Sequence, residues 1–460
     1  MQQTTEHERK LEAPAGFELP DLGGEPLEPR VFTSVYHDNS DRSLARAGIT
    51  LRRRTERGRS VWQLKLPIDG GARVELEEAG GPVGPPDKLR GLLRAHERRG
   101  PVGAVAELRT RRHGSLVTRA GATAEVTIDE VAVMDSHRVS GEFVELEVEL
   151  RDGDPAGLRR IAKALERAGA QETDQTPKLF RVLELEPRGV AGTPFEALRA
   201  RLREQLDEIL CHDPGTRVGT DPECLHDMRV AVRRARALLR AGKPLVETDT
   251  QMLSLELKWL GGILGDVRDL DVLLARLRGE AASLDPADRK AAGRLLRSLE
   301  RQRARARRAM LKALDGRRYA TLLDRFEDTL GELAPAAVDL TLDAVARRQL
   351  NKLRRAVRAA GAEPADDVLH DLRKRGKRAR YAYELAGAST VVKRAKALQD
   401  VLGEHQDSTV AEDRLRTLSR DAPPDQALAA GRLVEREREL RAQARASWRG
   451  VWRRLERAAR

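Results

Sequence analysis

Three residues near the start of the chain combine types and a spacing that suit phosphate chemistry. Glu6, Glu8 and Lys10 recur at every second position, and on a β-strand such residues share one face. Carboxylate oxygens are hard ligands of the kind that Mg²⁺ and Mn²⁺ prefer, and a lysine amine binds phosphate as a point charge. The stretch therefore predicts a strand that presents a divalent metal ion and a cation to a phosphate chain.

Other segments before residue 187 alternate in the same way between apolar and charged side chains. In residues 142–150, Glu145, Glu147 and Glu149 lie on the face opposite to the apolar residues. The charged positions of further segments are Arg52 with Arg54, Lys65, Arg109 with Arg111, and Glu125 with Asp129. For a single strand, the ordinary explanation is an antiparallel sheet with its charged face in water.

The repetition of this pattern on nearly every strand, with both signs of charge, favours a different arrangement. A closed antiparallel barrel turns the apolar faces outward beneath covering helices and the charged faces inward. Buried charges are costly unless they are paired, bound to a metal or matched by a ligand. We therefore expect a water-filled interior that holds a ligand of mixed charge, namely a phosphate chain with its divalent metal ions.

The period of the apolar pattern divides the chain into two parts. Strand-like alternation continues to residue 186 and includes residues 178–186, with helical interruptions at 85–100 and at 154–170, where Asp154 is the expected cap. From residue 194 the period is helical. We predict an α+β protein of two domains, with an antiparallel barrel over 1–188, a linker over 189–194 and an all-α domain over 195–460.

The charge is distributed unevenly between the two parts. Residues 1–190 carry 30 Lys and Arg against 32 Asp and Glu, and the remaining residues carry 55 against 41. A basic half attracts a polyanion such as nucleic acid or polyphosphate. Aromatic residues make up only 3% of the chain and offer little for base stacking, so a bare phosphate polymer is favoured and nucleic acid is not expected.

Composition also excludes several classes of protein. No apolar run of about 18 residues is present to span a bilayer, and the N-terminus lacks the pattern of a signal peptide. Cys211 and Cys224 do not have the spacing of a zinc site or of a disulfide framework. We expect a cytoplasmic protein with no membrane partner.

The helical half contains an internal duplication. LHDMRVAVRRAR from Leu225 matches LHDLRKRGKRAR from Leu369, so the repeats span about 195–335 and 336–460. The basic stripe of the first copy is His226, Arg229, Arg233 and Arg236, and that of the second is His370, Arg373, Lys377 and Arg380. A solvated basic face is the ordinary explanation for one such helix. The same order of histidine and basic residues in both copies favours a shared groove for a linear polyanion.

Together, the motifs of residues 4–186 resemble the CYTH domain, or triphosphate tunnel metalloenzyme. Its pattern of Glu-x-Glu-x-Lys, basic strands and acidic strands in this order is specific. The resemblance implies an antiparallel barrel whose tunnel binds triphosphate, with one or two divalent metal ions held by carboxylates. Its members include inorganic triphosphatases, thiamine triphosphatases and class IV adenylate cyclases.

The resemblance also implies roles for individual residues. The implied metal ligands are Glu6, Glu8, Asp129, Glu145 and Glu147. The implied phosphate-binding residues are Arg52, Arg54, Lys65, Arg73, Arg109, Arg111 and Lys178. The implied catalytic residues are Glu6, Glu8, Lys10 and Glu147. The group that activates the attacking water stays open among Glu147, Glu149 and Lys10.

Residues 194–460 resemble the CHAD domain, a helical module that often follows CYTH. The match is carried by the HxxR motif at His226 and Arg229 and again at His370 and Arg373. It implies two four-helix bundles that bind polyphosphate through the basic and histidine stripes. The second copy departs from the first because it lacks the counterparts of Arg268 and Asp271.

The leading expectation is a hydrolase that uses Mg²⁺ or Mn²⁺ to cleave inorganic triphosphate or a short polyphosphate in the barrel. The helical domain is expected to bind longer polyphosphate, and an association with polyphosphate granules follows from that binding. One alternative is a non-catalytic protein that binds polyphosphate for targeting or storage. The other is a thiamine triphosphatase or adenylate cyclase, for which no residue that reads adenine or thiamine is visible.

Overall fold

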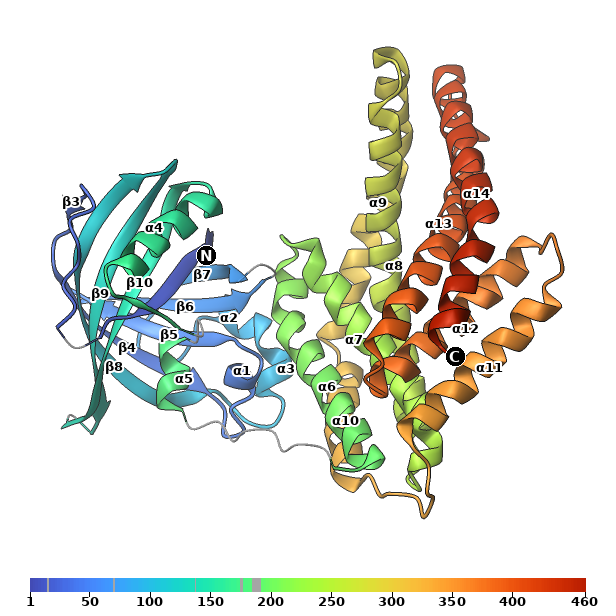
Figure 1. Ribbon diagram of the computed structural model, residues 1–460. Helices are drawn as coiled ribbons and strands as arrows, with labels where there is room; N and C mark the ends of the chain where they lie inside the picture. Colours follow the sequence, from blue (N-terminus) through green and yellow to red (C-terminus); the bar gives the residue numbers. More distant parts are fainter. Residues whose placement is uncertain (15, 69–70, 137, 174–176, 184–191) are drawn as a thin grey trace. The chain divides into compact units, whose positions relative to one another are not determined.

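The computed structural model describes residues 1–14, 16–68, 71–136, 138–173, 177–183 and 192–460 (Figure 1). The chain forms two compact units. The barrel unit comprises Met1–Arg188 with Leu210–Cys224, and the helical unit comprises Gly189–Ile209 with Leu225–Arg460. Each unit has a core of its own and is described separately.

The barrel unit is built on one antiparallel sheet. Its strands are β1 (Gln2–Glu6), β2 (Glu8–Glu12), β3 (Glu25–Pro26), β4 (Arg30–Asp38), β5 (Thr50–Glu56), β6 (Arg59–Pro67), β7 (Arg73–Ala79), β8 (Gly103–Arg119), β9 (Ala122–Asp135), β10 (Arg138–Gly153) and β11 (Gln171–Glu172). Their order is β1-β7-β6-β5-β4-β8-β9-β10-β2-β11, and β3 pairs with β8. Four neighbouring pairs in this order, β5–β6, β6–β7, β8–β9 and β9–β10, are joined by short connections, which suits antiparallel pairing.

The N-terminal segment brings the two sides of the sheet together. Strand β1 pairs with β7, whereas β2, which begins two residues after β1 ends, pairs with β10. The backbone carbonyl of His7, between the two strands, accepts a hydrogen bond of 2.9 Å from the amide of Leu150. The sheet is therefore tunnel-like, but it is not the fully closed barrel that the sequence pattern predicts, because the closing strand is interrupted at His7.

Helices cover parts of the outer face of the sheet. Helix α4 (Pro155–Arg167) packs Leu158, Ile161 and Leu165 against β2, β9 and β10. Its N-cap Asp154 accepts a hydrogen bond from the amide of Gly157, as the sequence predicts. Helices α1 (Ser43–Arg46), α2 (Asp87–Leu92) and α3 (Arg94–Glu97) lie beside β5, β6 and β7. Where these helices cover the sheet, the apolar strand faces therefore point outward and the charged faces point inward.

One segment differs from its predicted conformation. Residues 178–182 form helix α5 (Lys178–Val182) rather than a strand, and residues 184–186 lie outside the described part. A helical turn places Leu179 and Leu183 on one side, since residues four apart share a helix face. This side joins an apolar cluster with Tyr36, Leu108 and Val131. Helix α5 therefore packs at one end of the tunnel interior.

From Pro194 onward the described chain is helical. The helices are α6 (Pro194–Val218), α7 (Pro222–Gly242), η2 (Lys243–Leu245), α8 (Gln251–Ala282), α9 (Pro286–Leu314), α10 (Arg317–Glu332), α11 (Leu342–Ala359), α12 (Asp366–Leu385), α13 (Ser389–Ser419) and α14 (Pro424–Ala458). The hairpins α8–α9 and α13–α14 are equivalent elements of the two repeats and share a core that includes Leu277, Leu299, Leu415 and Leu433. Figure 1 shows these long helices standing side by side.

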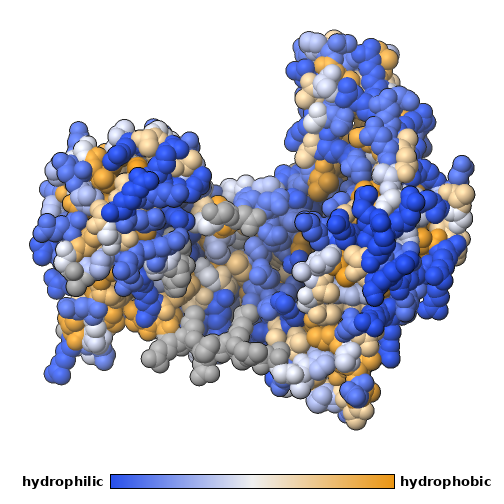
Figure 2. All heavy atoms as spheres, viewed as in Figure 1, coloured by the Kyte–Doolittle hydropathy of each residue, from blue (hydrophilic) through white to orange (hydrophobic). Residues whose placement is uncertain are grey.

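The surface of the helical unit is predominantly hydrophilic in the face that Figure 2 shows. Among the described helices, none combines the length and the apolar character that a bilayer crossing requires.

Candidate tunnel site and basic cluster

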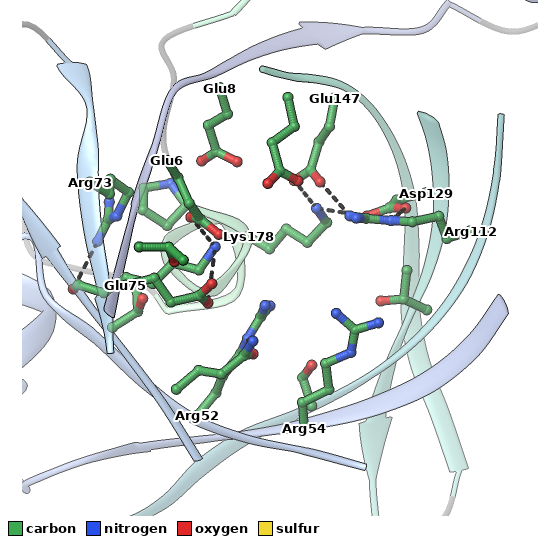
Figure 3. A pocket seen from close by; sticks show the side chains of 18 of the residues that line it. Glu6, Glu8, Arg52, Arg54, Arg73, Glu75, Arg112, Asp129, Glu147 and Lys178 are labelled. Atoms are coloured by element: carbon green, nitrogen blue, oxygen red, sulfur yellow. Dashed lines mark hydrogen bonds and ion pairs between the residues drawn. The ribbon is translucent and has the colours of Figure 1, made fainter. Parts of the chain in front are cut away.

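The inner faces of the strands enclose a cavity of about 420 Å³ (Figure 3). On β10, Glu147 and Glu149 face this cavity, while Leu146 and Val148 on the opposite face are buried beneath α4. The predicted site residues that line the cavity are Glu6, Glu8, Lys10, Arg52, Arg54, Lys65, Arg73, Asp129, Glu147 and Lys178. They come from most strands of the sheet and from α5, so the fold brings residues that are far apart in the sequence together in one site.

Two predicted phosphate-binding residues lie elsewhere. The side chains of Arg109 and Arg111 lie on the outer face of β8, where both are exposed and line a separate surface hollow. The basic residue that β8 contributes to the tunnel is Arg112. The prediction for Arg109 and Arg111 was wrong because it assumed that the apolar residues of each strand face outward.

At this end of the tunnel the assumption fails. Leu108 faces inward and is 1% exposed, because it packs in the apolar cluster with Leu179. The inward positions of β8 are therefore the even ones. A usable clue was present in the pairing of β8 with β9, which sets Arg112 opposite Asp129. Cross-strand neighbours share a face, so a predicted inward Asp129 requires an inward Arg112.

Three cations and three carboxylates form a buried ionic cluster on one wall of the tunnel. Lys178 Nζ lies 2.9 Å from Asp129 and 2.6 Å from Glu145, and it also contacts Glu147. Lys10 Nζ lies 3.1 Å from Glu145 and 3.5 Å from Glu147. Arg112 binds both carboxylate oxygens of Asp129 at 2.6 Å and also contacts Glu147. The charges of this cluster balance, as burial requires.

Opposite charges act differently on the members of this cluster. Burial alone would raise the pKa of Glu147, but Lys178, Arg112 and Lys10 outweigh it and hold that pKa well below its usual value. Burial likewise opposes the charge of Lys178, yet Glu147, Asp129 and Glu145 raise its pKa well above the usual value. At Glu145 burial prevails, and the pKa of that carboxyl is raised although Lys178 and Lys10 lie close.

A second ionic group lies across the tunnel. Lys65 Nζ lies 2.5 Å from Glu6 and 3.5 Å from Glu75. Burial raises the pKa of Glu6, and Lys65 partly offsets this effect. Arg52 donates to Gln63 at 2.7 Å and to the hydroxyl of Tyr36 at 3.3 Å. These residues present a carboxylate beside two cations to the tunnel centre, as Figure 3 shows for Glu6 and Arg52.

Glu8 and Glu149 form a pair of facing carboxylates in the tunnel. They are directly opposite each other on β2 and β10, and both line the cavity. Burial raises the pKa of Glu149 to about 7, and the charges of Glu6 and Glu147 add to this effect against Arg151. Facing carboxylates repel each other unless they share a cation. Hard oxygen donors in this arrangement fit Mg²⁺ or Mn²⁺.

The described side chains do not yet form a complete metal centre. Among residues 1–14, 16–68, 71–136, 138–173, 177–183 and 192–460, no three His, Cys, Asp or Glu side chains converge as metal ligands. Asp129, Glu145 and Glu147 are engaged by the cations of the ionic cluster. Their predicted role as ligands stays a prediction.

The two ends of the tunnel differ in character. Arg30 and Arg151 line the cavity, and their side chains are 34% and 42% exposed. Both contact Glu125, at 3.7 Å and 2.8 Å respectively. At the other end, Leu179 packs in the apolar cluster with Leu108 and Val131. The charged and partly exposed end is therefore the one that Arg30 and Arg151 line.

In the helical unit, the two basic stripes come together. The apolar stripe of α7, with Met228 and Val232 at 0% exposure, enters the core. The basic cluster comprises Arg229 and Arg233 of α7 with Arg373, Lys377 and Arg380 of α12. Arg233 lies within electrostatic reach of Arg229, Arg373 and Arg380, because these three cations, together with burial, lower its pKa.

The duplication is visible in the partners of the basic cluster. Arg229 pairs with Asp269 of α8 at 2.9 Å, and Arg373 contacts Asp407 of α13 at 3.8 Å. A Cβ atom at Gly265 would lie 3.4 Å from Arg229 Nε, and one at Gly403 would lie 3.7 Å from Arg373 Nη2. The small residue at each position lets an arginine lie close against the neighbouring helix.

Three residues of the two basic stripes do not belong to the basic cluster. His226, Arg236 and His370 lie on α7 and α12 and are partly buried. Burial and the neighbouring Arg240 lower the pKa of Arg236. Burial and Lys374 lower the pKa of His370, although Gln406 partly offsets them.

Lys377, a member of the basic cluster, has a strongly lowered pKa. Burial and the charges of Arg373, Arg233 and Arg229 lower it to about 7.

A curled sheet with an ionic interior, joined to a duplicated helical domain, defines a triphosphate-tunnel protein with a CHAD module. The chain belongs to the proteins that combine a CYTH domain with a CHAD domain. The CYTH domain matches residues 4–180, and the CHAD domain matches residues 200–416.

Known proteins resemble the chain over different lengths. The Mycobacterium tuberculosis (strain H37Rv) protein Rv2226 is 31% identical over 93% of this chain and 90% of its own length. PptA from Streptomyces chartreusis is 24% identical, with a TM-score of 0.49, over 56% of this chain and 99% of that chain. The CHAD domain from the plant Ricinus communis is 26% identical, with a TM-score of 0.47, over 60% of this chain and 96% of that chain.

Proposed function

We propose that the tunnel hydrolyses inorganic triphosphate or a short polyphosphate with the aid of Mg²⁺ or Mn²⁺. The observation that carries the proposal is the enclosed cavity of about 420 Å³ whose wall presents cations and carboxylates together. A phosphate chain with bound divalent cations carries both signs of charge and complements such a wall. The tunnel accepts this substrate from the end where Arg30 and Arg151 lie.

The residues of the tunnel have distinct tasks in this reaction. Arg52, Arg54 and Arg112 bind the phosphate oxygens and stabilise the charge that develops on them. Glu6, Glu8 and Glu149 would hold Mg²⁺ or Mn²⁺, which would supply positive charge against the phosphate oxygens. Lys10 and Lys178, fixed by the buried carboxylates, orient the inner end of the chain.

Carboxylates on the two faces of the sheet give a matched test. Glu8→Gln removes a tunnel carboxylate, whereas Glu130→Gln changes one whose side chain is 48% exposed on the outer face. We expect Glu8→Gln to lower phosphate release from tripolyphosphate with Mg²⁺ or Mn²⁺ by about 100-fold or more, and Glu130→Gln to leave it unchanged. Equal activity in both variants and the unchanged protein, or no hydrolysis by any of them, would contradict the proposal.

We further propose that the basic cluster binds longer polyphosphate. Five cations from two helices gather around one place, and their described acidic partners are three: Asp269, Asp407 and Glu384. The same observation favours a second candidate function, in which the whole protein binds polyphosphate without cleaving it. Saturable binding without turnover, unaffected by Glu6→Ala and Glu8→Ala, would favour that candidate.

Hydrolysis of thiamine triphosphate or cyclisation of ATP ranks below these candidates. A substrate panel of tripolyphosphate, thiamine triphosphate, ATP and long polyphosphate distinguishes them. The domain limits 1–188 and 195–460, a cytoplasmic location and an association with polyphosphate granules belong to the same proposal. Fractionation of cells with and without granules tests the location.

A further inference from the structure

The helical unit contains a second cavity, separate from the basic cluster. It has a volume of about 360 Å³ and lies among α6, α7, α12 and α13. Its described lining includes none of the eight residues of the two basic stripes. A cavity of this size is in the range that small organic ligands occupy. We refer to it as the Gln205 cavity.

A buried polar side chain without a partner lies in its wall. Gln205 of α6 is 7% exposed, and its Oε1 atom is buried without a hydrogen-bond partner. Arg234 also lines the cavity, and its buried Nε atom makes no hydrogen bond but lies 3.7 Å from Glu384. A buried polar group without a partner costs free energy, so such groups in a cavity wall indicate a ligand that satisfies them.

The start of α13 supplies further hydrogen-bond donors. This helix of 31 residues begins at Ser389, which lines the cavity, and its N-cap Ala388 provides no side-chain hydrogen bond. The amide of Ser389 itself donates to the carbonyl of Gly387 at 3.0 Å. The next amides of the first turn lack acceptors within the helix and carry a partial positive charge. Together with the guanidinium of Arg234 they form a place for an anion such as a phosphate group.

The charges of the wall limit the size of that anion. Glu204 pairs with Arg201 at 2.9 Å, and Glu384 pairs with Arg380 of its own helix at 3.2 Å. Arg234 lies 3.7 Å from Glu384, at the outer range of an ion pair. The two arginines and two glutamates of the lining balance, and the neighbouring Arg380 adds one positive charge, so one positive charge and the helix start are in excess. This excess matches a single phosphate group better than a polyphosphate chain, which carries a charge on every unit.

The rest of the wall is apolar or aromatic. Leu238, Leu385 and Val392 line the cavity together with Tyr381, which is 7% exposed. Inorganic phosphate has no group that would contact such a surface. An organic phosphate monoester does, and the amide of Gln205 can accept or donate a hydrogen bond at the edge of a heterocyclic base.

We infer that the Gln205 cavity binds a nucleoside monophosphate. Its phosphate lies at the start of α13 beside Arg234, and its base and sugar lie against the apolar wall within reach of Gln205. The site is distinct from both the tunnel and the basic cluster, so the inference does not depend on whether the tunnel is an enzyme.

Calorimetric titration of the full chain with AMP, GMP, CMP and UMP tests the inference. We expect one site per chain for at least one nucleotide, with the corresponding nucleoside and inorganic phosphate each at least about tenfold weaker, because each makes only part of the contacts. Arg234→Gln and Gln205→Leu should each weaken binding about tenfold or more. Arg378→Gln, an exposed residue of α12 that does not line the cavity, should leave binding unchanged.

Two further measurements keep the test decisive. Gln205→Glu keeps the size of the side chain and places a negative charge in the cavity that receives the anionic ligand, so it should weaken binding more than Gln205→Leu does. Hydrogen exchange should show protection of residues 201–209 and 385–392 when the nucleotide is added. No binding of the four nucleotides at millimolar concentration would overturn the inference. The inference would also be overturned if Arg112→Gln or Arg373→Glu abolished nucleotide binding while Arg234→Gln left it unchanged, because binding would then lie in the tunnel or the basic cluster.

Discussion

The tunnel and the basic cluster use the same kinds of charged residue in opposite ways. In the tunnel, Lys10, Lys178 and Arg112 are each held by buried carboxylates. In the basic cluster, cations from α7 and α12 face one another and depress each other's pKa values. An enclosed site must balance its charges because desolvation is costly, whereas a partly exposed site tolerates an excess. The first arrangement suits chemistry on a short metal-bound chain, and the second suits retention of a long polyanion.

The largest expected effect comes from removing one charge of the balanced tunnel. Glu147→Ala leaves Lys178, Lys10 and Arg112 with fewer carboxylates. Loss of one partner from a buried ionic network costs about 3–5 kcal/mol of unfolding free energy. Urea unfolding measures this loss, and phosphate release from tripolyphosphate should disappear in parallel. A variant as stable as the unchanged chain would show that the cluster is not desolvated.

Charge reversal in the basic cluster should affect binding rather than stability. Arg229→Glu combined with Arg373→Glu removes two cations and adds two anions. We expect the affinity for long polyphosphate to fall by about 100-fold or more, since each charged hydrogen bond contributes about 1.5–3 kcal/mol. Turnover of tripolyphosphate should remain within about twofold of its original rate. A similar loss of turnover would mean that the two sites are not separate.

Titration of Lys377 gives the basic cluster a dependence on pH. Burial and the neighbouring Arg373, Arg233 and Arg229 lower the pKa of Lys377 to about 7, against the partial compensation of Asp407. A bound polyanion opposes this repulsion and raises that pKa, so binding takes up a proton above pH 7. The affinity for long polyphosphate should therefore fall as the pH rises from 7 to 9 and be nearly constant below 7.

The same lysine has the opposite effect on the unbound helical unit. The unfolded chain binds a proton at Lys377 up to about pH 10.4, and the folded chain only up to about 7, so stability should rise with pH between these values.

Calorimetry in buffers of different ionisation enthalpy measures the proton uptake when polyphosphate binds. Lys377→Arg, which stays charged, should abolish the uptake and the pH dependence of affinity. Unchanged uptake in that variant would assign it to another group.

The smallest expected effects concern helix caps, one in each unit. Asp154 caps α4 beneath the barrel sheet, and Thr341 caps α11 in the helical unit by accepting from the amide of Ala344. Asp154→Ala and Thr341→Ala should each lower stability by about 0.5–2 kcal/mol without changing turnover or polyphosphate affinity. Thermal unfolding with both assays checks this, and altered turnover in Asp154→Ala would show that α4 positions the tunnel residues directly.

The sequence allowed much of this comparison to be predicted because periodicity is a local property. Alternation identified Glu147 and Glu149 as inward residues of β10, and the 144-residue repeat identified Arg229 and Arg373 as equivalent. Both depend only on spacing along the chain. The interruption of the closing strand at His7 could not be predicted, because it depends on which edges of the sheet pair.

Errors arose where packing reversed the local pattern. Arg109 and Arg111 were assigned inward because Leu108 was assumed to face outward, but Leu108 packs inside the tunnel against Leu179 of α5. The prediction of a strand at residues 178–186 belongs to the same error, since α5 supplies the apolar cluster that turns Leu108 inward. Tertiary packing of one short helix therefore decided which arginine of β8 lines the tunnel.

Neighbouring arginines of β8 provide the most direct test of the tunnel as the reaction site. Arg112 lies inside and Arg111 outside, one residue apart on the same strand. Phosphate release from tripolyphosphate, followed by ³¹P NMR with Mg²⁺, should fall about 10- to 100-fold in Arg112→Gln, because a charged contact to the substrate is lost. It should be unchanged in Arg111→Gln. Equal rates in both variants, or a larger loss in Arg111→Gln, would contradict the assignment of the chemistry to the tunnel.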